Sequence, residues 1–293
     1  MAESLADWLE VREPADTAAR CVPLTQLIAG TIPVDEPVNV LDLATGTGAN
    51  IRYLLERLPG RQRWLVVDRN PDLLALQTRR VATWAAPRGY HLDVTPNGFC
   101  VSGKDLGCEV ETLRRDLGEL DDAALFEGRH LVTASALLDL VSERWLRTLA
   151  ARCHASGASA LLALTYNGES TCAPIEAEDD LIRDLLNRHQ RTDKGLGGPA
   201  AGPDAVSCAE RSFTEMGYHV RVAPADWAVA PAQHELQRQL INGWADAAGE
   251  LAPELTATIA NWRQRRMAHL DAGHSHIVVR HHDLAAWPAD PDH

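Results

Sequence analysis

The chain has 293 residues, of which 45% are hydrophobic and 24% are charged, and its formal net charge is -13 at pH 7. This length suffices for one large domain, or for a domain with a subdomain. The acidic balance argues against nucleic acid as the main partner, because binding to phosphates needs clustered lysines and arginines.

The start of the chain is acidic and lacks the apolar run of a secretory signal peptide. No stretch approaches the roughly 20 apolar residues that a membrane-spanning helix needs. The six cysteines are scattered without a Cys-x-x-Cys pair, which is typical of reduced thiols rather than of a disulfide framework. We therefore expect a cytoplasmic protein that has no membrane partner.

Residues 1–36 are expected to form an N-terminal helical cap, with one or two helices over 4–30 that are interrupted near Pro14 and Pro23. From residue 37 onward strand and helix patterns alternate, which predicts a doubly wound, mostly parallel sheet. The predicted strands lie at residues 38–43, 64–67, 110–113, 131–134, 161–166, 218–223 and 277–279.

The first predicted strand leads into a turn of small residues and then into a helical pattern that begins near Ile51. A buried strand, a glycine turn and a helix start together make a site for a nucleotide-like ligand. A dinucleotide site usually reads G-x-G-x-x-G, but here Ile51 stands in the place of the third glycine. Asp42 at the end of the strand would repel a pyrophosphate and suits a cation.

The pattern Asp42-x-Ala44-x-Gly46-x-Gly48 resembles motif I, (D/E)-x-G-x-G-x-G, of the class I S-adenosylmethionine-dependent methyltransferases. Ala44 replaces the first glycine, and alanine still permits close backbone approach if its φ is negative. The resemblance covers about residues 37–165. It implies a Rossmann-like fold with a seven-stranded sheet, S-adenosyl-L-methionine as the cofactor, and methyl transfer as the reaction.

Acids follow three successive strands of the predicted sheet, where open α/β sheets bind their ligands. By the resemblance, Asp42 faces the methionyl amine, and Asp116 with the Leu117 backbone meets the adenine amino group. Asp68 follows Asp42 at close to the spacing of about 20 residues at which an acid accepts hydrogen bonds from ribose hydroxyls. The other residues expected at the cofactor are Ala44, Gly46, Gly48, Asn50, Arg69 and Ser135.

The helices at residues 1–30 and, in the second half of the chain, the segments 168–215 and 230–272 are expected to supply the acceptor site. Residues 37–166 form the predicted cofactor-binding core, residues 167–216 a helical and glycine-rich insertion that serves as an acceptor lid, and residues 217–293 the rest of the sheet with a two-helix insertion. The helical insertions thus follow the fifth and sixth strands.

Two residues of this half are candidate catalytic groups. His189 precedes the glycine-rich stretch and is a candidate general base, although a hydrogen-bonded histidine at a helix end is the simpler interpretation. Tyr166 ends the fifth strand and either contacts the acceptor or packs as an ordinary aromatic. The arginines at 263, 265 and 266 are interpreted as a solvated helix face. No metal is expected, because the histidines at 274, 276, 281 and 282 lack an acid or cysteine at a recognisable spacing.

These features predict an enzyme that transfers a methyl group to a small-molecule acceptor by in-line displacement. A methyltransferase with a protein or RNA acceptor is one alternative, and a nonenzymatic protein that binds S-adenosylmethionine or a nucleotide is another. The sequence is compatible with oxygen, nitrogen or sulfur as the methylated atom, and with a monomer or a homodimer.

Overall fold

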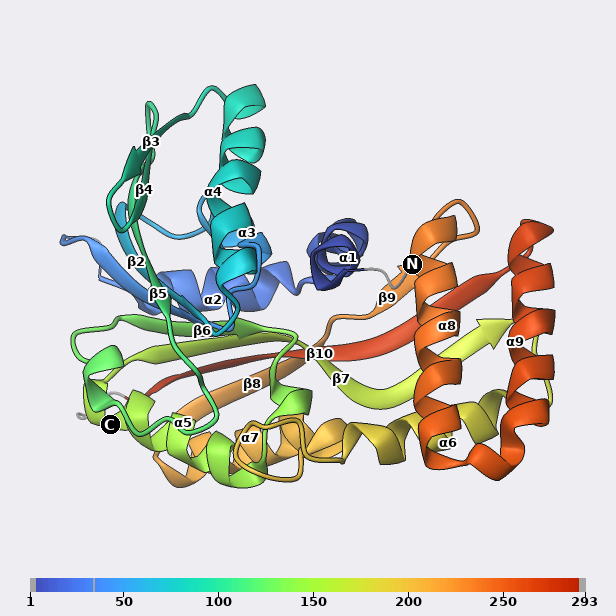
Figure 1. Cartoon of the computed structure of the whole chain (residues 1–293). Helices are drawn as coiled ribbons and strands as arrows, with labels where there is room; N and C mark the ends of the chain where they lie inside the picture. The colour runs from blue at the N-terminus through green and yellow to red at the C-terminus, as the bar shows by residue number, and fades with distance from the viewer. Residues whose placement is uncertain (1–3, 34, 290–293) are drawn as a thin grey trace.

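The computed structural model describes residues 4–33 and 35–289, and within these ranges the strands form one mixed sheet of ten strands. The strands are β1 (Val38–Leu43), β2 (Arg61–Asp68), β3 (His91–Thr95), β4 (Gly98–Ser102), β5 (Gly107–Arg114), β6 (Leu131–Ser135), β7 (Ser159–Ala173), β8 (Tyr218–Pro224), β9 (Trp227–Val229) and β10 (His276–Pro288). Their spatial order is β3-β4-β5-β2-β1-β6-β7-β10-β8, and β9 pairs with β10 (Figure 1).

The middle of the sheet is parallel and doubly wound. Strands β5, β2, β1, β6 and β7 pair in parallel, whereas β10 runs antiparallel to both β7 and β8. The strand order reverses between β1 and β6, so the topological switch point lies at the carboxyl ends of these two strands. The fold is therefore Rossmann-like, as expected.

All seven expected strands are present, but the described residues hold three more. Strands β3 and β4 form a hairpin on the free edge of β5. Strand β9 has only three residues, which is too short to leave an alternating pattern in the sequence. The expectation of a seven-stranded sheet was therefore wrong in number.

The described helices of four residues or more cover the faces and one end of this sheet. They are α1 (Leu5–Ala19), α2 (Val22–Thr31), α3 (Ala49–Leu54), α4 (Pro71–Ala85), α5 (Glu143–Ser156), α6 (Asp179–Gln190), α7 (Ala205–Glu215), α8 (His234–Leu251) and α9 (Thr256–Asp271). In Figure 1, α5 and α7 lie below the sheet, whereas α2, α3 and α4 lie on its other side.

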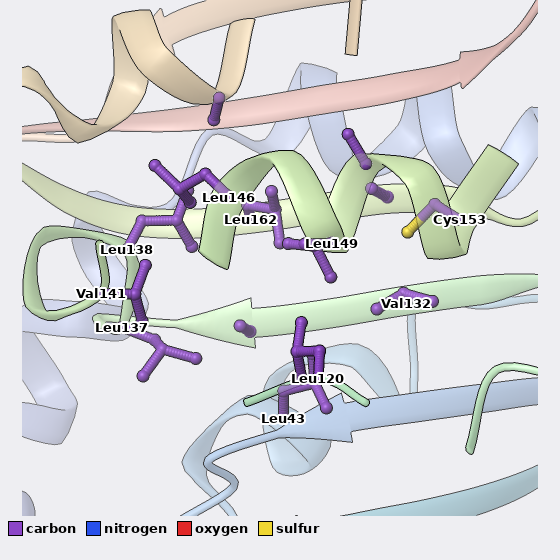
Figure 2. Packing of buried hydrophobic residues seen from close by; sticks show 14 of the residues in the cluster. Leu43, Leu120, Val132, Leu137, Leu138, Val141, Leu146, Leu149, Cys153 and Leu162 are labelled. Atoms are coloured by element: carbon purple, nitrogen blue, oxygen red, sulfur yellow. The ribbon is translucent and has the colours of Figure 1, made fainter. Parts of the chain in front are cut away.

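Alternation along β1 explains these two layers, because successive side chains of a strand point to opposite faces. Val38 and Val40 pack into a hydrophobic core with α2, α3 and α4. Leu41 and Leu43 pack into a second core with α5 and α7. Figure 2 shows this second core, with Leu146, Leu149 and Cys153 of α5 over the side chains of the neighbouring strands.

A third core lies beyond the carboxyl end of the parallel sheet. It joins α6, α8 and α9 to β9 and to the outer halves of β7 and β10, and Trp227, Trp244 and Trp262 are among its buried residues. Helix α1 also contributes Ala15 to it. Helix α6 from the insertion after the fifth strand and α8 and α9 from the insertion after the sixth thus build one body (Figure 1), whereas α7 packs in the second core.

Two local expectations differ from the structure. Helix α1 continues through Pro14, because its contacts with β9 and α8 hold both halves in one line despite the missing N–H group. Helix α3 ends at Leu54 rather than near Leu58, and turn residues follow it.

None of the helices in the described part of the chain combines the length and the apolar character needed to cross a membrane. All six cysteines are free thiols.

Candidate functional site

The turn after β1 is attached to the end of β2 by backbone hydrogen bonds. Gly46 N donates to Asp68 Oδ2 at 2.8 Å, and Thr45 N donates to the Val67 carbonyl at 3.0 Å. The other carboxylate oxygen of Asp68, Oδ1, accepts from Asn70 N at 2.8 Å. Asp68 therefore shapes the turn and the start of α4, and it does so with a buried carboxylate.

The small residues of this turn have different roles. Ala44 has a φ of 54°, in the left-handed region, so the condition of a negative φ is not met there. Gly48 has a φ of 81°, and a Cβ on it would lie 2.7 Å from Gln77 Cγ of α4. Gly48 is thus needed for close packing of the turn on α4, and alanine at position 44 is held in a backbone conformation that costs about 1–2 kcal/mol.

Asp42 is fully buried beneath the turn. Its Oδ1 accepts a hydrogen bond from Asn50 Nδ2 at 2.7 Å, while its Oδ2 has no hydrogen-bond partner among the described residues. Asn50 is held in turn by Arg20, whose Nη1 donates to Asn50 Oδ1 at 2.9 Å. Burial raises the pKa of Asp42 to about 6.

A cavity of about 290 Å³, here called the first cavity, lies against this turn. Eight of the ten residues expected at the cofactor line it: Asp42, Ala44, Gly46, Asn50, Asp68, Arg69, Leu117 and Ser135. The other two, Gly48 and Asp116, are not among its lining residues. Asp116 is exposed, and its Oδ1 accepts from Gly118 N at 2.8 Å.

A second cavity, of about 670 Å³, adjoins the first and shares Arg12, Ala136 and Leu140 with it. Its walls come from α1, β7, α6, β9, α8 and β10, and three tryptophans, Trp8, Trp227 and Trp244, line it. Both candidate catalytic residues, Tyr166 and His189, also line it. The structure therefore brings the expected cofactor residues and the expected acceptor residues to neighbouring spaces.

Neither candidate catalytic residue has a free basic atom in this arrangement. His189 Nε2 lies 2.9 Å from Glu250 Oε2, and its Nδ1 lies 3.4 Å from Lys194 Nζ, so both ring nitrogens have partners. Tyr166 is buried, and burial raises the pKa of its hydroxyl further above its ordinary value. A phenol in this state donates a hydrogen bond rather than acting as a base.

Two buried titratable residues of the second cavity were not singled out as site residues. Asp139 follows β6 and is 7% exposed, and burial raises its pKa to about 6. His281 is 6% exposed, and burial and the charge of Arg12 lower its pKa to about 3, so its ring is neutral. Asp139 follows the fourth predicted strand and lies within residues 37–165, where the sequence resembles the methyltransferases. His281 had no such signal, since it comes from the distant β10.

The remaining sequence expectations concern residues outside the two cavities. Within the described ranges no group of three or more potential metal ligands is found. His274 and His276 are exposed. The interpretation of the arginine group as a solvated face was wrong for Arg266, which is fully buried and paired with Asp179.

Comparison with known proteins adds structures of low similarity. Neither a protein-family model nor a curated protein sequence matches the chain. The cyclopropane synthase MmaA2 from Mycobacterium tuberculosis is 12% identical, with a TM-score of 0.44 over 90% of this chain and 83% of that one. The YcgJ protein from Bacillus subtilis is 11% identical, with a TM-score of 0.46 over 92% of this chain and 99% of that one.

A precorrin methyltransferase from Geobacter metallireducens is 9% identical, with a TM-score of 0.42 over 90% of this chain and 86% of that one. Similarities of this size do not assign a reaction, so the function is argued from the residues of the two cavities.

Proposed function

We propose that the protein is an S-adenosylmethionine-dependent methyltransferase, with the cofactor in the first cavity and a small-molecule methyl acceptor in the second. One observation carries this proposal. The turn that resembles motif I lines a cavity at the switch point of the sheet, and that cavity shares a wall with a larger, aromatic-lined one.

The residues of the first cavity fit this cofactor. The unpartnered Oδ2 of Asp42 is a buried acceptor that suits the ammonium group of a methionyl moiety. Asp68 keeps lone pairs beyond its two backbone hydrogen bonds, and these can accept from the two hydroxyls of a ribose. A pyrophosphate fits less well, because the carboxylates of Asp42, Asp68 and Asp16 line the cavity. Arg12, which also lines it, already pairs with Asp16.

When bound, the cofactor supplies a methyl group on a sulfonium, which is already a good leaving group. The residues of this chain position the two reactants and exclude water, and such positioning lowers a barrier by several kcal/mol. Helix α1 contributes to both tasks, since Leu9 and Arg12 line the first cavity and Trp8 and Arg12 line the second.

A small acceptor is favoured over a protein or RNA acceptor by the walls of the second cavity. Elements from both ends of the chain surround it, and Trp8, Tyr166, Trp227 and Trp244 are among its lining residues. Binding of RNA would require a basic surface, whereas the chain carries 41 acidic against 28 basic residues.

Isothermal titration with S-adenosylmethionine, its demethylated product and NAD tests the proposal. We expect both sulfur compounds to bind and NAD not to bind. Asp68→Asn should weaken binding of S-adenosylmethionine at least about tenfold, because a buried hydrogen bond to a charged group contributes about 1.5–3 kcal/mol. The exposed Asp72→Asn, four residues further on in α4, is the control and should leave the affinity unchanged.

Binding of NAD without binding of S-adenosylmethionine would overturn the proposal in favour of a nicotinamide-binding protein. Binding of S-adenosylmethionine with no product formed from any acceptor class would favour the nonenzymatic alternative.

A further inference from the structure

We propose that the acceptor is a small aromatic molecule bearing a hydroxyl group, and that Asp139 is the catalytic base that takes the proton of this hydroxyl. This inference rests on the proposed methyl transfer and extends it to the class of substrate and to a residue of the second cavity.

Asp139 stands where the two cavities meet. It lines the second cavity, and two residues close to it in sequence, Ala136 three positions earlier and Leu140 directly after it, line both. Its side chain belongs to the short helical turn Leu138–Leu140 that follows the carboxyl end of β6. A methyl acceptor in the second cavity must approach the first cavity at this junction. Asp139 therefore lies where it can take a proton from that molecule.

The carboxylate of Asp139 is available for a ligand. It is 7% exposed, and it forms no ion pair within residues 4–33 and 35–289. Burial raises its pKa, and a hydrogen bond from its own backbone N–H and the charge of Arg12 oppose this rise, so that the pKa is about 6. At pH 7 the carboxylate is therefore ionised, and it is a stronger base than an ordinary aspartate.

Other titratable and charged groups face the same space from every surrounding element. They are Arg12 on α1, Tyr166 on β7, His189 on α6, Lys194 in the glycine-rich loop, Asp246 on α8 and His281 on β10. His189 is bonded at both ring nitrogens, and the pKa of His281 is lowered to about 3. Asp246, the other carboxylate, is 71% exposed and pairs with Arg263 at 3.7 Å.

The walls of the second cavity favour a flat aromatic body. Three tryptophans line it, and the His281 ring lies 5.0 Å from the Trp227 ring and 6.1 Å from the Tyr166 ring. Aromatic side chains bind planar ligands by stacking and by edge-to-face contact.

A cationic amine is a poorer candidate, although tryptophans can also form a cage for cations. The Arg12 guanidinium already lies over two of these rings, 5.7 Å from the Trp8 centroid and 5.0 Å from the Trp227 centroid. The positive charge of Arg12 would repel a second cation placed against these rings.

The polar atoms of the cavity require a ligand with a hydrogen-bond donor. His281 Nδ1 lies 3.0 Å from the Val279 carbonyl and donates to it, which leaves Nε2 of the neutral ring as an acceptor. The Tyr166 hydroxyl is buried without a partner in the described structure. A hydroxyl on an aromatic ring fits Asp139, and a second oxygen or nitrogen on the ligand would fit Tyr166 or His281.

Asp139 then accepts the hydroxyl proton as the reaction proceeds. The acceptor oxygen forms a bond to the methyl carbon, and the carbon–sulfur bond breaks with its electron pair left on sulfur. The proton becomes bound to the Asp139 carboxylate and passes to solvent after the product leaves. Charge is balanced, because a sulfonium and a carboxylate become a neutral thioether and a carboxylic acid.

The binding test uses protein saturated with S-adenosylmethionine or its demethylated product, and a panel of bicyclic phenols: 1-naphthol, 2-naphthol and 7-hydroxycoumarin. Naphthalene, which lacks the hydroxyl, is the matched control ligand. We expect the phenols to bind at least about tenfold more tightly than naphthalene, as measured by quenching of tryptophan fluorescence. Naphthalene would leave the buried hydrogen-bond acceptors of the cavity unpaired. Equal affinity for phenols and naphthalene, or no binding of any phenol, would overturn the proposal.

The kinetic test compares the wild type with Asp139→Asn and with the exposed Asp184→Asn of α6 as a control. We expect Asp139→Asn to slow methylation of the best phenol at least about 100-fold, with the affinity for the cofactor retained. The wild-type rate should rise with pH up to about 6 and then level off. In Asp139→Asn this bend should vanish, and the rate should climb toward about pH 10, where a phenol ionises unaided.

The two proposals fail in different ways. If the protein does not bind S-adenosylmethionine, the proposed function fails. If it binds S-adenosylmethionine but the phenols are not methylated, or if Asp139→Asn keeps the full rate and the bend near pH 6, only this inference fails.

Discussion

Asp42 combines complete burial with one oxygen that has no hydrogen-bond partner in the described structure. Burial disfavours the charged form, and the pKa of about 6 reflects this cost. A cation placed beside Oδ2 would offset the cost and stabilise the carboxylate. The pKa of Asp42 should therefore fall when S-adenosylmethionine binds.

This linkage predicts that the affinity for S-adenosylmethionine rises with pH. Below pH 6 binding must displace a proton from Asp42, so Kd should fall by up to about tenfold per pH unit between pH 5 and 6 and level off above about pH 7. Titration calorimetry over this range measures the effect. Asp42→Asn should bind more weakly and lose the pH dependence.

A matched control comes from Asp139, which has a pKa of about 6 as well but lies in the second cavity. Asp139→Asn should retain the pH dependence of cofactor binding. A flat profile in the wild type would contradict the placement of the ammonium at Asp42.

The sequence predicted the site best where its residues lie close together along the chain. Asp42, Ala44 and Gly46 follow one strand directly, so their neighbourhood is decided within a few residues. The conformation of Ala44 was not predictable, because a positive φ at alanine is held by the surrounding turn rather than by its own preference. His281 reaches the second cavity from a strand that pairs with residues more than a hundred positions earlier, and no local pattern records that pairing.

Helix α1 contributes residues to the walls of both cavities. It is attached to the core by Glu13, whose carboxylate accepts from Arg52 Nε at 2.8 Å and from Arg52 Nη2 at 2.6 Å. Arg52 also donates to the Thr47 carbonyl at 2.7 Å, so this pair joins α1 to the turn beside the first cavity. A second pair, Glu10 with Arg80, is formed by a glutamate whose side chain is 70% exposed.

Loosening this attachment should speed exchange of the cofactor. Glu13→Gln removes one charge from a bidentate pair with a buried arginine, so we expect faster dissociation of S-adenosylmethionine, by about threefold to tenfold. Stopped-flow displacement measures the rate, and hydrogen exchange over residues 5–19 reports the opening of α1.

Glu10→Gln is the control for the loss of a glutamate charge from the same helix. The Glu10 side chain is 70% exposed, so the effect of its substitution on dissociation should be small. Equal effects of the two substitutions would show that the Glu13 pair has no special role in closure.

The elements themselves were largely predictable from periodicity and caps. Ser142 caps the start of α5 and Gly157 its end, and Asn70 caps α4, which begins at Pro71. The place of β9 was less predictable, because it pairs with β10, which follows only after α8 and α9.

On the scale of the molecule, β7 and β10 join the cofactor-binding sheet to the third core. Their antiparallel pairing extends from Ala160 with Ala286, inside the sheet, to Ala173 with His276, beside the helices of the third core. The walls of the second cavity that come from β7 and β10 are therefore built on continuous strands rather than on a flexible linker. The position of the second cavity relative to the first should depend on the integrity of this core.

Asp179 and Arg266 connect α6 to α9 within this part of the molecule. Arg266 is fully buried and pairs with Asp179, and Trp262 Nε1 donates to Asp179 Oδ1 at 2.8 Å. Arg266 Nη1 also donates to the Pro174 carbonyl, at 2.6 Å, directly after the end of β7. Removal of the carboxylate charge would leave a buried guanidinium without its counter-ion.

Asp179→Asn should therefore lower the free energy of unfolding by about 3 kcal/mol, the lower end of the range for breaking a buried pair. Because β7 and β10 run through both parts, we expect the whole chain to unfold in one transition at a lower Tm, with circular dichroism and tryptophan fluorescence coinciding. The neighbouring Asp180→Asn is the control, since Asp180 is 81% exposed and its pair with Arg183 should contribute less than about 1 kcal/mol. Two separate transitions in Asp179→Asn would instead show that the third core unfolds on its own, and that the acceptor side is an independent unit joined to the sheet only through its strands.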